Sequence, residues 1–268
     1  MENNNKYALI LGCSGGFGRA TALELAGLGY NIFGVHLDFG SNKKNAEELH
    51  EQIKKMGVKV MFFNLNAADE KNRDDVIETI KTALADEPDS YINVLIHSLA
   101  FGSIGPLIAP VEADQLQKKN LEMTLHVMAH SLLYWSQDLI HNKLIREGSK
   151  IITLTSAGSS RAMKNYGAVS VAKAALESYV RQLAVELAPY KITVNALSPG
   201  VTNTQAVKHI PGYESMLEAS KRINPNQRNT LPEDVSKAIS LFINDKSYWI
   251  TGQIIAVDGG ESIVNSFE

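Results

Sequence analysis

The chain has 268 residues, 44% of them hydrophobic and 21% charged, with a formal net charge of -3 at pH 7. The 26 basic and 29 acidic residues form no long blocks, which argues against a nucleic-acid-binding surface. Cys13 is the only cysteine, which excludes intrachain disulfides and a cysteine-rich zinc cluster, so we predict no metal site. No run approaches the ~18 apolar residues of a membrane span, and no signal peptide is recognisable. We therefore expect a soluble, cytoplasmic protein.

Seven short apolar runs recur along the chain, each the length of a strand. They are YALILG from residue 7, NIFGVHL from 31, VKVMFF from 58, YINVLIHS from 91, KIITLTS from 150, KITVNALS from 191 and QIIAVDGG from 253. The runs show little alternation of apolar and polar residues, which is typical of strands buried on both faces of a parallel sheet.

Between these runs, apolar residues spaced three and four apart predict helices with one apolar stripe, for example over residues 46–56, 76–84 and 235–242. The last of these follows Thr230, a candidate N-cap with Glu233 three residues further on. Alternating strands and helices predict an α/β fold: a single doubly wound (Rossmann) domain with a seven-stranded parallel sheet and helices on both faces.

Residues 200–228 interrupt this alternation, because they contain no strand-like run but do contain Pro211, Gly212 and Pro225. A connection of this length is usually a lid or a binding loop, although a surface excursion without function is the alternative. We expect a substrate-binding lid within one domain that spans residues 1–268.

A glycine-rich segment, LGCSGGFGRA, directly follows the first strand and contains Gly12, Gly16 and Gly18 in a G-x-x-x-G-x-G pattern. Such glycines permit a tight turn and let backbone N–H groups approach a pyrophosphate at the positive end of a helix. The turn also occurs for purely structural reasons. Its place after the first strand of a doubly wound sheet nevertheless favours a dinucleotide site.

Polar residues also follow three other strands, whose carboxyl ends meet at the same edge of the sheet. Asn66 follows the third strand, the backbone around Ser98 and Leu99 follows the fourth, and Ser156 follows the fifth. Serine and asparagine are common wherever strands stop, so each alone carries little weight. Their joint placement indicates one cofactor crevice, with Asn66 near an adenine.

The segment NYGAVSVAK places Tyr166 and Lys173 with six residues between them. Together with GCSGGFG, Asn120 in LQKKNLEM, Ser156, SPGVTNT and VDGG, it resembles the short-chain dehydrogenases/reductases over roughly residues 6–260. The resemblance implies that Tyr166 donates a proton, that Lys173 holds the nicotinamide ribose and lowers the tyrosine pKa, and that Ser156 bonds the substrate oxygen. An asparagine near Asn120 holds a helix kink in that family, although a helix cap explains this residue about as well. The implied cofactor-binding residues are Gly12, Ser14, Gly16, Phe17, Gly18, Asp38, Asn66, Ala67, Ser98, Leu99, Ala100, Lys173, Gly200, Val201, Thr202 and Thr204.

The six-residue spacing differs from the commonest pattern of this family, which leaves three residues between tyrosine and lysine. Helical positions seven apart lie two turns apart on nearly the same face, about 10 Å along the axis, so both side chains can reach one cofactor. Ketone reduction places hydride and proton on adjacent atoms. Reduction of an enoyl thioester instead develops charge on the thioester oxygen, which lies two bonds further from the carbon that accepts the hydride than a ketone oxygen does. A tyrosine moved toward the helix start suits the second reaction.

The enoyl-acyl-carrier-protein reductases of the same superfamily share the Tyr-x6-Lys spacing, and IHSLAFG resembles their HS-x-AF segment. The best-known of them carry a second tyrosine where this chain has Ser156, and PGVTNT is closer to the carbonyl-reductase form. The chain therefore resembles divergent enoyl reductases without that tyrosine, as TNTQAVKHIP also indicates. The resemblance implies NAD(P)H-dependent reduction of the trans-2 double bond of enoyl thioesters. It also implies that the acyl group is carried by acyl carrier protein, in fatty acid synthesis, and that the protein is a homotetramer.

Two alternatives differ in function. A carbonyl reductase acting on 3-oxoacyl, steroid or small ketone substrates would share every cofactor residue and differ in where the substrate lies. A catalytically inactive dinucleotide-binding protein on the same fold is the other alternative, but the joint presence of Tyr166, Lys173 and Ser156 argues against it.

The choice between NADH and NADPH is nearly balanced. Asp38 in VHLDFG can accept hydrogen bonds from the adenosine ribose and repel a 2′-phosphate, although the usual determinant position falls nearer His36. The divergent reductases generally use NADPH, and Arg19, Lys43 and Lys44 are candidate phosphate ligands. Gly15 stands where NADP-dependent enzymes often place a basic residue. NADH is slightly favoured.

Overall fold

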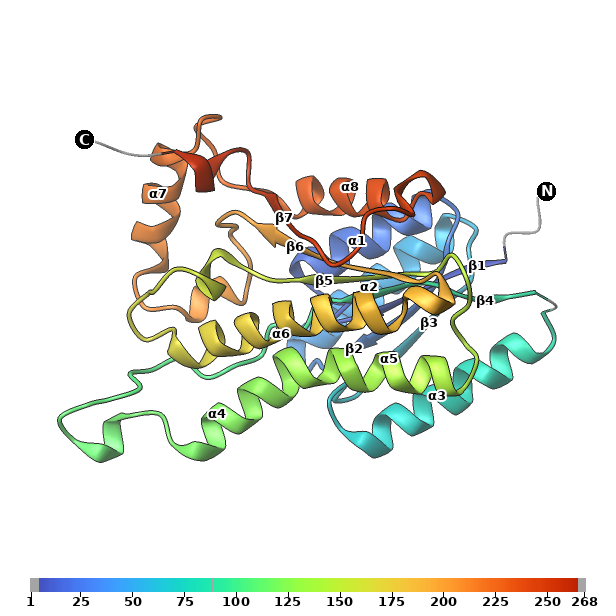
Figure 1. Ribbon diagram of the computed structural model, residues 1–268, viewed down its shortest axis with the longest axis horizontal. Helices are drawn as coiled ribbons and strands as arrows, with labels where there is room; N and C mark the ends of the chain where they lie inside the picture. The colour runs from blue at the N-terminus through green and yellow to red at the C-terminus, as the bar shows by residue number, and fades with distance from the viewer. Residues whose placement is uncertain (1–4, 88, 265–268) are drawn as a thin grey trace.

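Seven parallel strands form one sheet in the computed structural model, which describes residues 5–87 and 89–264 (Figure 1). The strands are β1 Lys6–Leu11, β2 Asn31–His36, β3 Val60–Asn64, β4 Tyr91–His97, β5 Lys150–Leu154, β6 Thr193–Pro199 and β7 Ile254–Val257. Their order is β3-β2-β1-β4-β5-β6-β7, so the winding direction reverses between β1 and β4. All seven predicted strands are confirmed, and the reversal places a crevice at the carboxyl ends of β1 and β4.

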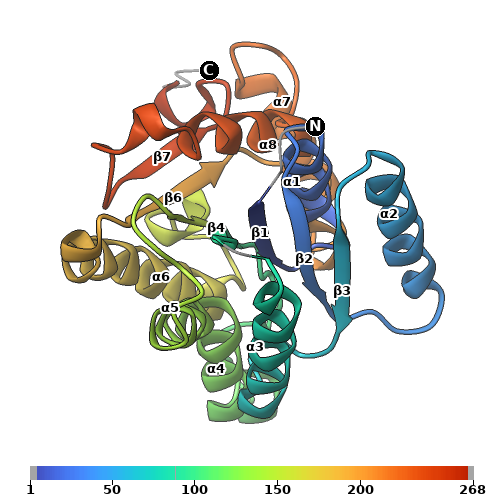
Figure 2. The same ribbon diagram turned by 90° about the vertical axis from the view of Figure 1, so that its right-hand side faces the viewer.

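Helices cover both faces of the sheet, as predicted for a doubly wound fold (Figure 2). They are α1 Gly16–Gly27, α2 Lys43–Lys55, α3 Glu70–Ala85, α4 Lys118–Leu125, α5 Ser131–His141, α6 Gly167–Glu186, α7 Tyr213–Ile223 and α8 Pro232–Phe242. Helices α1, α2 and α8 pack on one face, whereas α3, α5 and α6 pack on the other. Helix α7 lies beyond the carboxyl ends of the strands, on the left in Figure 1.

The alternation of side chains along β1 explains how one strand serves both layers. Leu9 and Leu11 point into the core under α3, α5 and α6, whereas Ala8 and Ile10 point into the core under α1 and α8. The edge strands differ, because β3 and β7 are only partly buried and Met61 and Ile254 are exposed. The prediction of burial on both faces is therefore wrong for these two strands, each of which has a neighbour on one side only.

The start of α8 also differs from the prediction. Leu231 is the N-cap residue, and the Asp234 carboxylate accepts a hydrogen bond from the Leu231 N–H at 2.9 Å. Thr230 instead donates its N–H to the carbonyl of Val201, so it does not cap the helix with Glu233. Pro232 begins the helix because proline at its first position lacks only an N–H that would be unpaired there.

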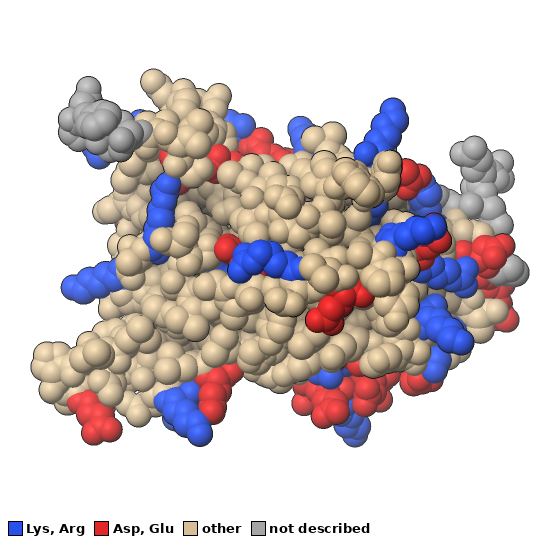
Figure 3. Space-filling model, in the orientation of Figure 1, with Lys and Arg blue, Asp and Glu red and all other residues tan. Residues whose placement is uncertain are grey.

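Charged side chains of both signs are interspersed on the face in Figure 3, with broad uncharged areas between them. Within the described part of the chain, no helix has both the length and the apolar composition needed to cross a membrane.

Candidate active site

A cavity of about 390 Å³ opens at the carboxyl edge of the sheet. Its walls come from the start of α1, the segments after β4, β5 and β6, and α6. Eleven of the predicted site residues line it: Phe17, Ser98, Leu99, Ala100, Ser156, Tyr166, Lys173, Gly200, Val201, Thr202 and Thr204. Gly12, Ser14, Gly16 and Gly18 lie in the adjoining glycine-rich turn, between β1 and the first turn of α1. The fold thus brings together residues that are up to 187 positions apart, from Phe17 to Thr204.

Tyr166 and Ser156 lie side by side on the wall that follows β5. Tyr166 occupies the N-cap position of α6, and its ring packs so closely on Gly158 that a Cβ there would lie 2.5 Å from Tyr166 Cε1. Burial raises the pKa of Tyr166, and the neighbouring Ser156 hydroxyl opposes the increase. Ser156 Oγ is buried and has no hydrogen-bond partner among the described residues. A buried hydroxyl without a partner beside the tyrosine fits a site that binds a substrate oxygen.

Lys173 lies two turns further along α6 on the same cavity. Its Nζ donates a hydrogen bond to the carbonyl of Leu154 at 2.6 Å, and burial lowers its pKa to about 8. Glu177, one turn later, opposes this decrease and accepts a hydrogen bond from Thr155 Oγ1 at 2.7 Å. Tyr166 and Lys173, the two residues of the predicted spacing, therefore line one cavity, and the lysine is held by the carbonyl of the last residue of β5.

The glycine-rich turn fits a dinucleotide pyrophosphate on steric grounds. Gly12 has a φ of +84°, and a Cβ there would lie 2.6 Å from the carbonyl oxygen of Ser98. At Gly18, a Cβ would lie 2.0 Å from the Gly12 carbonyl oxygen, so no side chain is tolerated without a backbone shift. Among the described residues no side chain caps α1, and its first turn contains no acid. The positive end of this helix is therefore suited to bind an anion.

Asp38 lies outside the cavity, just beyond the carboxyl end of β2. Its Oδ2 is 2.8 Å from His36 Nδ1, and its backbone N–H donates to Asn64 Oδ1 at 2.9 Å. The nearby Cys13 thiol belongs to the glycine-rich turn, and burial together with the Asp38 charge raises its pKa. Gly12 and Cys13 donate their N–H groups to the carbonyl of Val35, three residues before Asp38, so Asp38 follows the part of β2 that is bonded to the glycine-rich turn.

Asn66 and Ala67 lie between β3 and α3, also outside the cavity. Asn66 Oδ1 accepts a hydrogen bond from the Ala68 N–H at 3.0 Å, so this side chain stabilises its own turn. Ala67 is buried, and its carbonyl accepts a hydrogen bond from Trp135 Nε1 at 2.8 Å. Their contact with an adenine stays a prediction.

The structure does not bring Asn120 to the cavity. Its Oδ1 accepts a hydrogen bond from the Gln117 N–H at 3.0 Å, and its Nδ2 donates to Ser103 Oγ at 3.3 Å. Asn120 therefore caps the start of α4, so the helix-cap interpretation is the one that the contacts support. The irregular part of this helical segment is the π-helical turn His126–His130, which separates α4 from α5.

His97 is a buried residue whose role the sequence did not reveal. Its Nε2 lies 2.8 Å from Ser131 Oγ, and its Nδ1 lies 2.9 Å from Thr153 Oγ1. Burial lowers the pKa of His97 to about 3, so the ring stays neutral and links β4, β5 and α5 beneath the cavity. The hydrogen-bond partners of His97 are distant in sequence, so no local pattern marks this residue. Glu177, by contrast, follows Lys173 by four residues on the same helix, and this spacing could have identified it.

The segment 200–228 contributes apolar side chains to the cavity. It includes α7 and the short turn Val207–His209, so it is more ordered than the loop that the sequence indicates. Val207, Ile210 and Met216 line the cavity. The predicted lid therefore lies against the site, although its motion stays a prediction.

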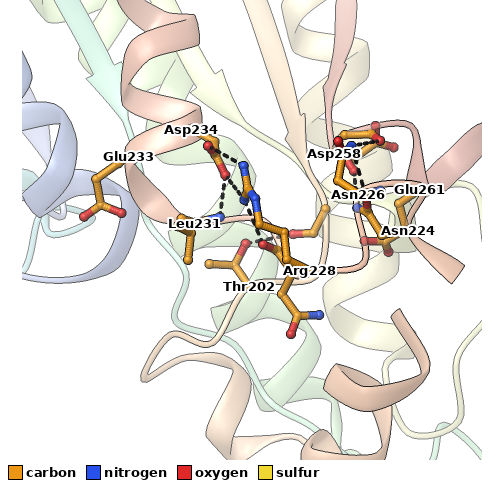
Figure 4. A network of polar contacts seen from close by, with 12 residues as sticks. Thr202, Asn224, Asn226, Arg228, Leu231, Glu233, Asp234, Asp258 and Glu261 are labelled. Atoms are coloured by element: carbon orange, nitrogen blue, oxygen red, sulfur yellow. Dashed lines mark hydrogen bonds and ion pairs between the residues drawn. The ribbon is translucent and has the colours of Figure 1, made fainter. Parts of the chain in front are cut away.

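Polar side chains fasten the carboxyl end of this segment, as Figure 4 shows. Asn224 Nδ2 donates to the Asp258 carbonyl at 2.8 Å, and Arg228 binds both carboxylate oxygens of Asp234, at 2.6 and 3.0 Å. Deeper in the segment, Glu261 Oε2 accepts a hydrogen bond from Ser220 Oγ at 2.7 Å. The bonds of Ser220 and Asn224 tie α7 and the residue after it to the segment that follows β7, whereas Arg228 ties the end of the lid to α8.

Comparisons with known proteins agree with this geometry. A family model described as enoyl-(acyl carrier protein) reductase matches residues 12–262. The chain is 29% identical to the NADH enoyl-[acyl-carrier-protein] reductase FabI of Nostoc sp., over 98% of this chain and 99% of that protein. It is 27% identical to versicolorin reductase stcU of Emericella nidulans, over 96% of each. The crystal structure of enoyl-[acyl-carrier-protein] reductase (NADH) from Aquifex aeolicus has the same fold, with a TM-score of 0.85, 22% identity and 98% of each chain covered. The chain therefore belongs to the enoyl-acyl-carrier-protein reductase family within the short-chain dehydrogenases/reductases, and it is an oxidoreductase.

Proposed function

We propose that this protein reduces the trans-2 double bond of enoyl thioesters. The observation that carries the proposal is the position of Tyr166 at the N-cap of α6, two turns before Lys173 and on the same cavity. The nicotinamide of the cofactor, when bound, supplies the hydride for the β-carbon. The charge then develops on the thioester oxygen, three bonds from that carbon, where a tyrosine further from the lysine is better placed than one close to it.

The residues of the chain provide the proton donors and bind the cofactor. Tyr166 donates a hydrogen bond, and then a proton, to the thioester oxygen. Ser156 provides a second donor from its unpartnered hydroxyl. Lys173, fixed by the Leu154 carbonyl, binds the nicotinamide ribose, and its positive charge favours ionisation of the tyrosine. The glycine-rich turn and the start of α1 bind the pyrophosphate.

The lid gives the proposal its substrate class. Val207, Ile210 and Met216 present apolar surface to the cavity, which suits an acyl chain better than a small polar ketone. We propose that the acyl group is carried by acyl carrier protein, as for the Nostoc relative, and that residues 200–228 cover it within a single domain. The inferred pathway is fatty acid synthesis.

Carbonyl reduction is the second candidate, and Ser156 is the observation that favours it. A serine hydroxyl beside Tyr166 places two donors on one side of the cavity, which also suits the oxygen of a ketone. The similarity to versicolorin reductase over nearly the whole chain is consistent with this reading. The two candidates differ in which oxygen takes the developing charge: the thioester oxygen in enoyl reduction, or the oxygen attached to the carbon that accepts the hydride in carbonyl reduction.

Purified protein should distinguish the candidates when it is assayed with crotonyl and acetoacetyl thioesters in parallel. We expect NAD(P)H oxidation with the crotonyl thioester. Oxidation with the acetoacetyl thioester alone would establish carbonyl reduction instead. Cofactor binding without turnover of either substrate would indicate a catalytically inactive dinucleotide-binding protein.

We propose NADH as the preferred cofactor, because the Asp38 carboxylate adjoins the glycine-rich turn and would repel a 2′-phosphate. A tenfold preference corresponds to only about 1.4 kcal/mol, the effect of one good charged contact. Values of kcat/KM for both cofactors test this, since wild-type preference for NADPH, or no change in Asp38→Ala, contradicts it. We also propose a homotetramer, which a monomeric mass in light scattering would refute.

A further inference from the structure

We propose that His36 is a positioning residue for cofactor selection: it holds the Asp38 carboxylate in the orientation that favours NADH over NADPH. This inference deepens the proposed function and rests on its nicotinamide cofactor. Without a contact, the side chain of Asp38 would be free to rotate in the turn after β2. The contact with His36 fixes the orientation of its carboxylate.

The histidine is itself held rigidly. His36 is the last residue of β2, its side chain is 7% exposed, and its ring lies edge-on to Phe62 with centroids 5.8 Å apart. The Nδ1 atom of the ring lies 2.8 Å from Asp38 Oδ2. Because Oδ2 of a carboxylate accepts, Nδ1 must carry the proton.

Asp38 is held from a second direction by β3. Its N–H donates to Asn64 Oδ1 at 2.9 Å, and Asn64 Nδ2 donates to the Asp38 carbonyl at 3.1 Å. Asn64 is the last residue of β3, so the backbone of Asp38 is bound to one strand and its side chain to another. The carboxylate has little freedom to rotate away from its position.

This arrangement leaves one carboxylate oxygen for a ligand. Among the described residues no donor bonds to Oδ1, and the Asp38 side chain is 14% exposed. A ribose diol offers hydroxyl donors to such an oxygen, whereas a 2′-phosphate brings negative charge to a carboxylate that cannot turn aside. Without His36, the carboxylate would be free to rotate away from the phosphate, and the discrimination would weaken.

The chain offers a matched control for this test. His50, on α2, also lies edge-on to Phe62, with centroids 5.5 Å apart, but its Nδ1 is 3.5 Å from Glu51 and not near Asp38. His36→Leu removes the donor and keeps a buried apolar group. His36→Asn restores an N–H donor near the position of Nδ1. His50→Leu removes an equivalent ring from the same neighbourhood.

The experiment measures dissociation constants of NADH and NADPH by calorimetry or cofactor fluorescence, which requires no substrate turnover. We expect the ratio of the NADPH to the NADH constant to fall about fivefold in His36→Leu, the effect of one net hydrogen bond. The ratio should recover in His36→Asn and stay at the wild-type value in His50→Leu. Retained NADPH binding in His36→Leu would show that the variant is folded.

An unchanged ratio in His36→Leu, or an equal change in His50→Leu, overturns the inference. So does a wild type that binds NADPH more tightly, although enoyl thioester reduction would survive that result. A wild type that binds neither cofactor overturns both proposals. If crotonyl thioester is not reduced but the ratio falls as expected, the inference about His36 stands and the proposed reaction fails.

Discussion

The two walls of the cavity are built by different means. The glycine-rich turn is fixed by its main chain: Gly12 donates its N–H to the Val35 carbonyl at 2.8 Å, and Ser98 donates to the Leu11 carbonyl at 2.9 Å. The lid, residues 200–228, has main-chain bonds to other segments at its start, but its later part is fixed by side chains, such as Ser220 with Glu261. Backbone bonds between strands resist opening more than single side-chain contacts do. The cofactor wall should therefore be rigid and the acyl wall adaptable.

The catalytic pair lies between these walls, and its removal should have the largest effect. Tyr166→Phe deletes the proton donor and should lower kcat by about 10²- to 10⁴-fold, the usual contribution of a positioned acid, with little change in cofactor affinity. Lys173→Ala should lower kcat and also weaken cofactor binding, because this lysine binds the ribose. Steady-state rates and cofactor dissociation constants separate the two roles. Equal cofactor affinity in Lys173→Ala and wild type would contradict the role given to the lysine.

The rigidity of the cofactor wall can be tested at Gly18. A Cβ there would lie 2.0 Å from the Gly12 carbonyl oxygen, a contact that only a backbone shift can relieve. We expect Gly18→Ala to lose about 1–3 kcal/mol of unfolding free energy and at least tenfold in cofactor affinity. Gly15→Ala is the stability control, because its Cβ would meet nothing within 4 Å. Wild-type stability and cofactor affinity in Gly18→Ala would show that this turn adjusts easily.

The sequence predicts those features of the fold that are encoded by short local patterns. The strands, their switch point and most cavity residues follow from short patterns, because a buried parallel strand and a glycine-rich turn are encoded within about ten residues. The edges of the sheet were less predictable, since the burial of Met61 and Ile254 depends on which strands end up outermost.

Two further features of the site depend on contacts that the sequence patterns do not show, one local and one between distant segments. Asn120 was assigned from the family pattern, but its nearest partner is Gln117, so a local cap takes the side chain away from the cavity. The bond between Ser220 and Glu261 joins residues 41 positions apart, and no sequence period marks it. Such pairs depend on the path of the intervening chain, which local propensity does not determine.

The electrostatic balance around Lys173 predicts a pH dependence. Its pKa is about 8, so the ammonium that serves catalysis is present below that pH and is lost as the pH rises through it. The alkaline limb of kcat/KM should therefore fall near pH 8, as this parameter reports the free enzyme. Glu177→Gln removes the charge that raises the lysine pKa, so the limb should move to lower pH.

Glu186→Gln is the control for this shift, because Glu186 is an exposed acid at the end of the same helix. Its profile should match that of the wild type. If the Glu177→Gln profile also matches the wild type, then Glu177 does not control the protonation of Lys173.

The smallest effect is expected in the lid, where trypsin can cut after Lys208, Lys221 or Arg222. NADH and crotonyl thioester together should slow this cleavage, because a covered acyl chain would hold the apolar side chains of the lid in place. Ser220→Ala removes the bond to Glu261 and should speed cleavage a few-fold without ligands, as expected for about 1 kcal/mol of local stability. Ser240→Ala is its control, since Ser240 Oγ donates to a carbonyl of its own helix and, within the described part of the chain, to no other segment. If the ligands leave the cleavage rate unchanged, residues 200–228 are a fixed wall. The two sides of the cavity would then differ in their amino-acid composition and not in their mobility.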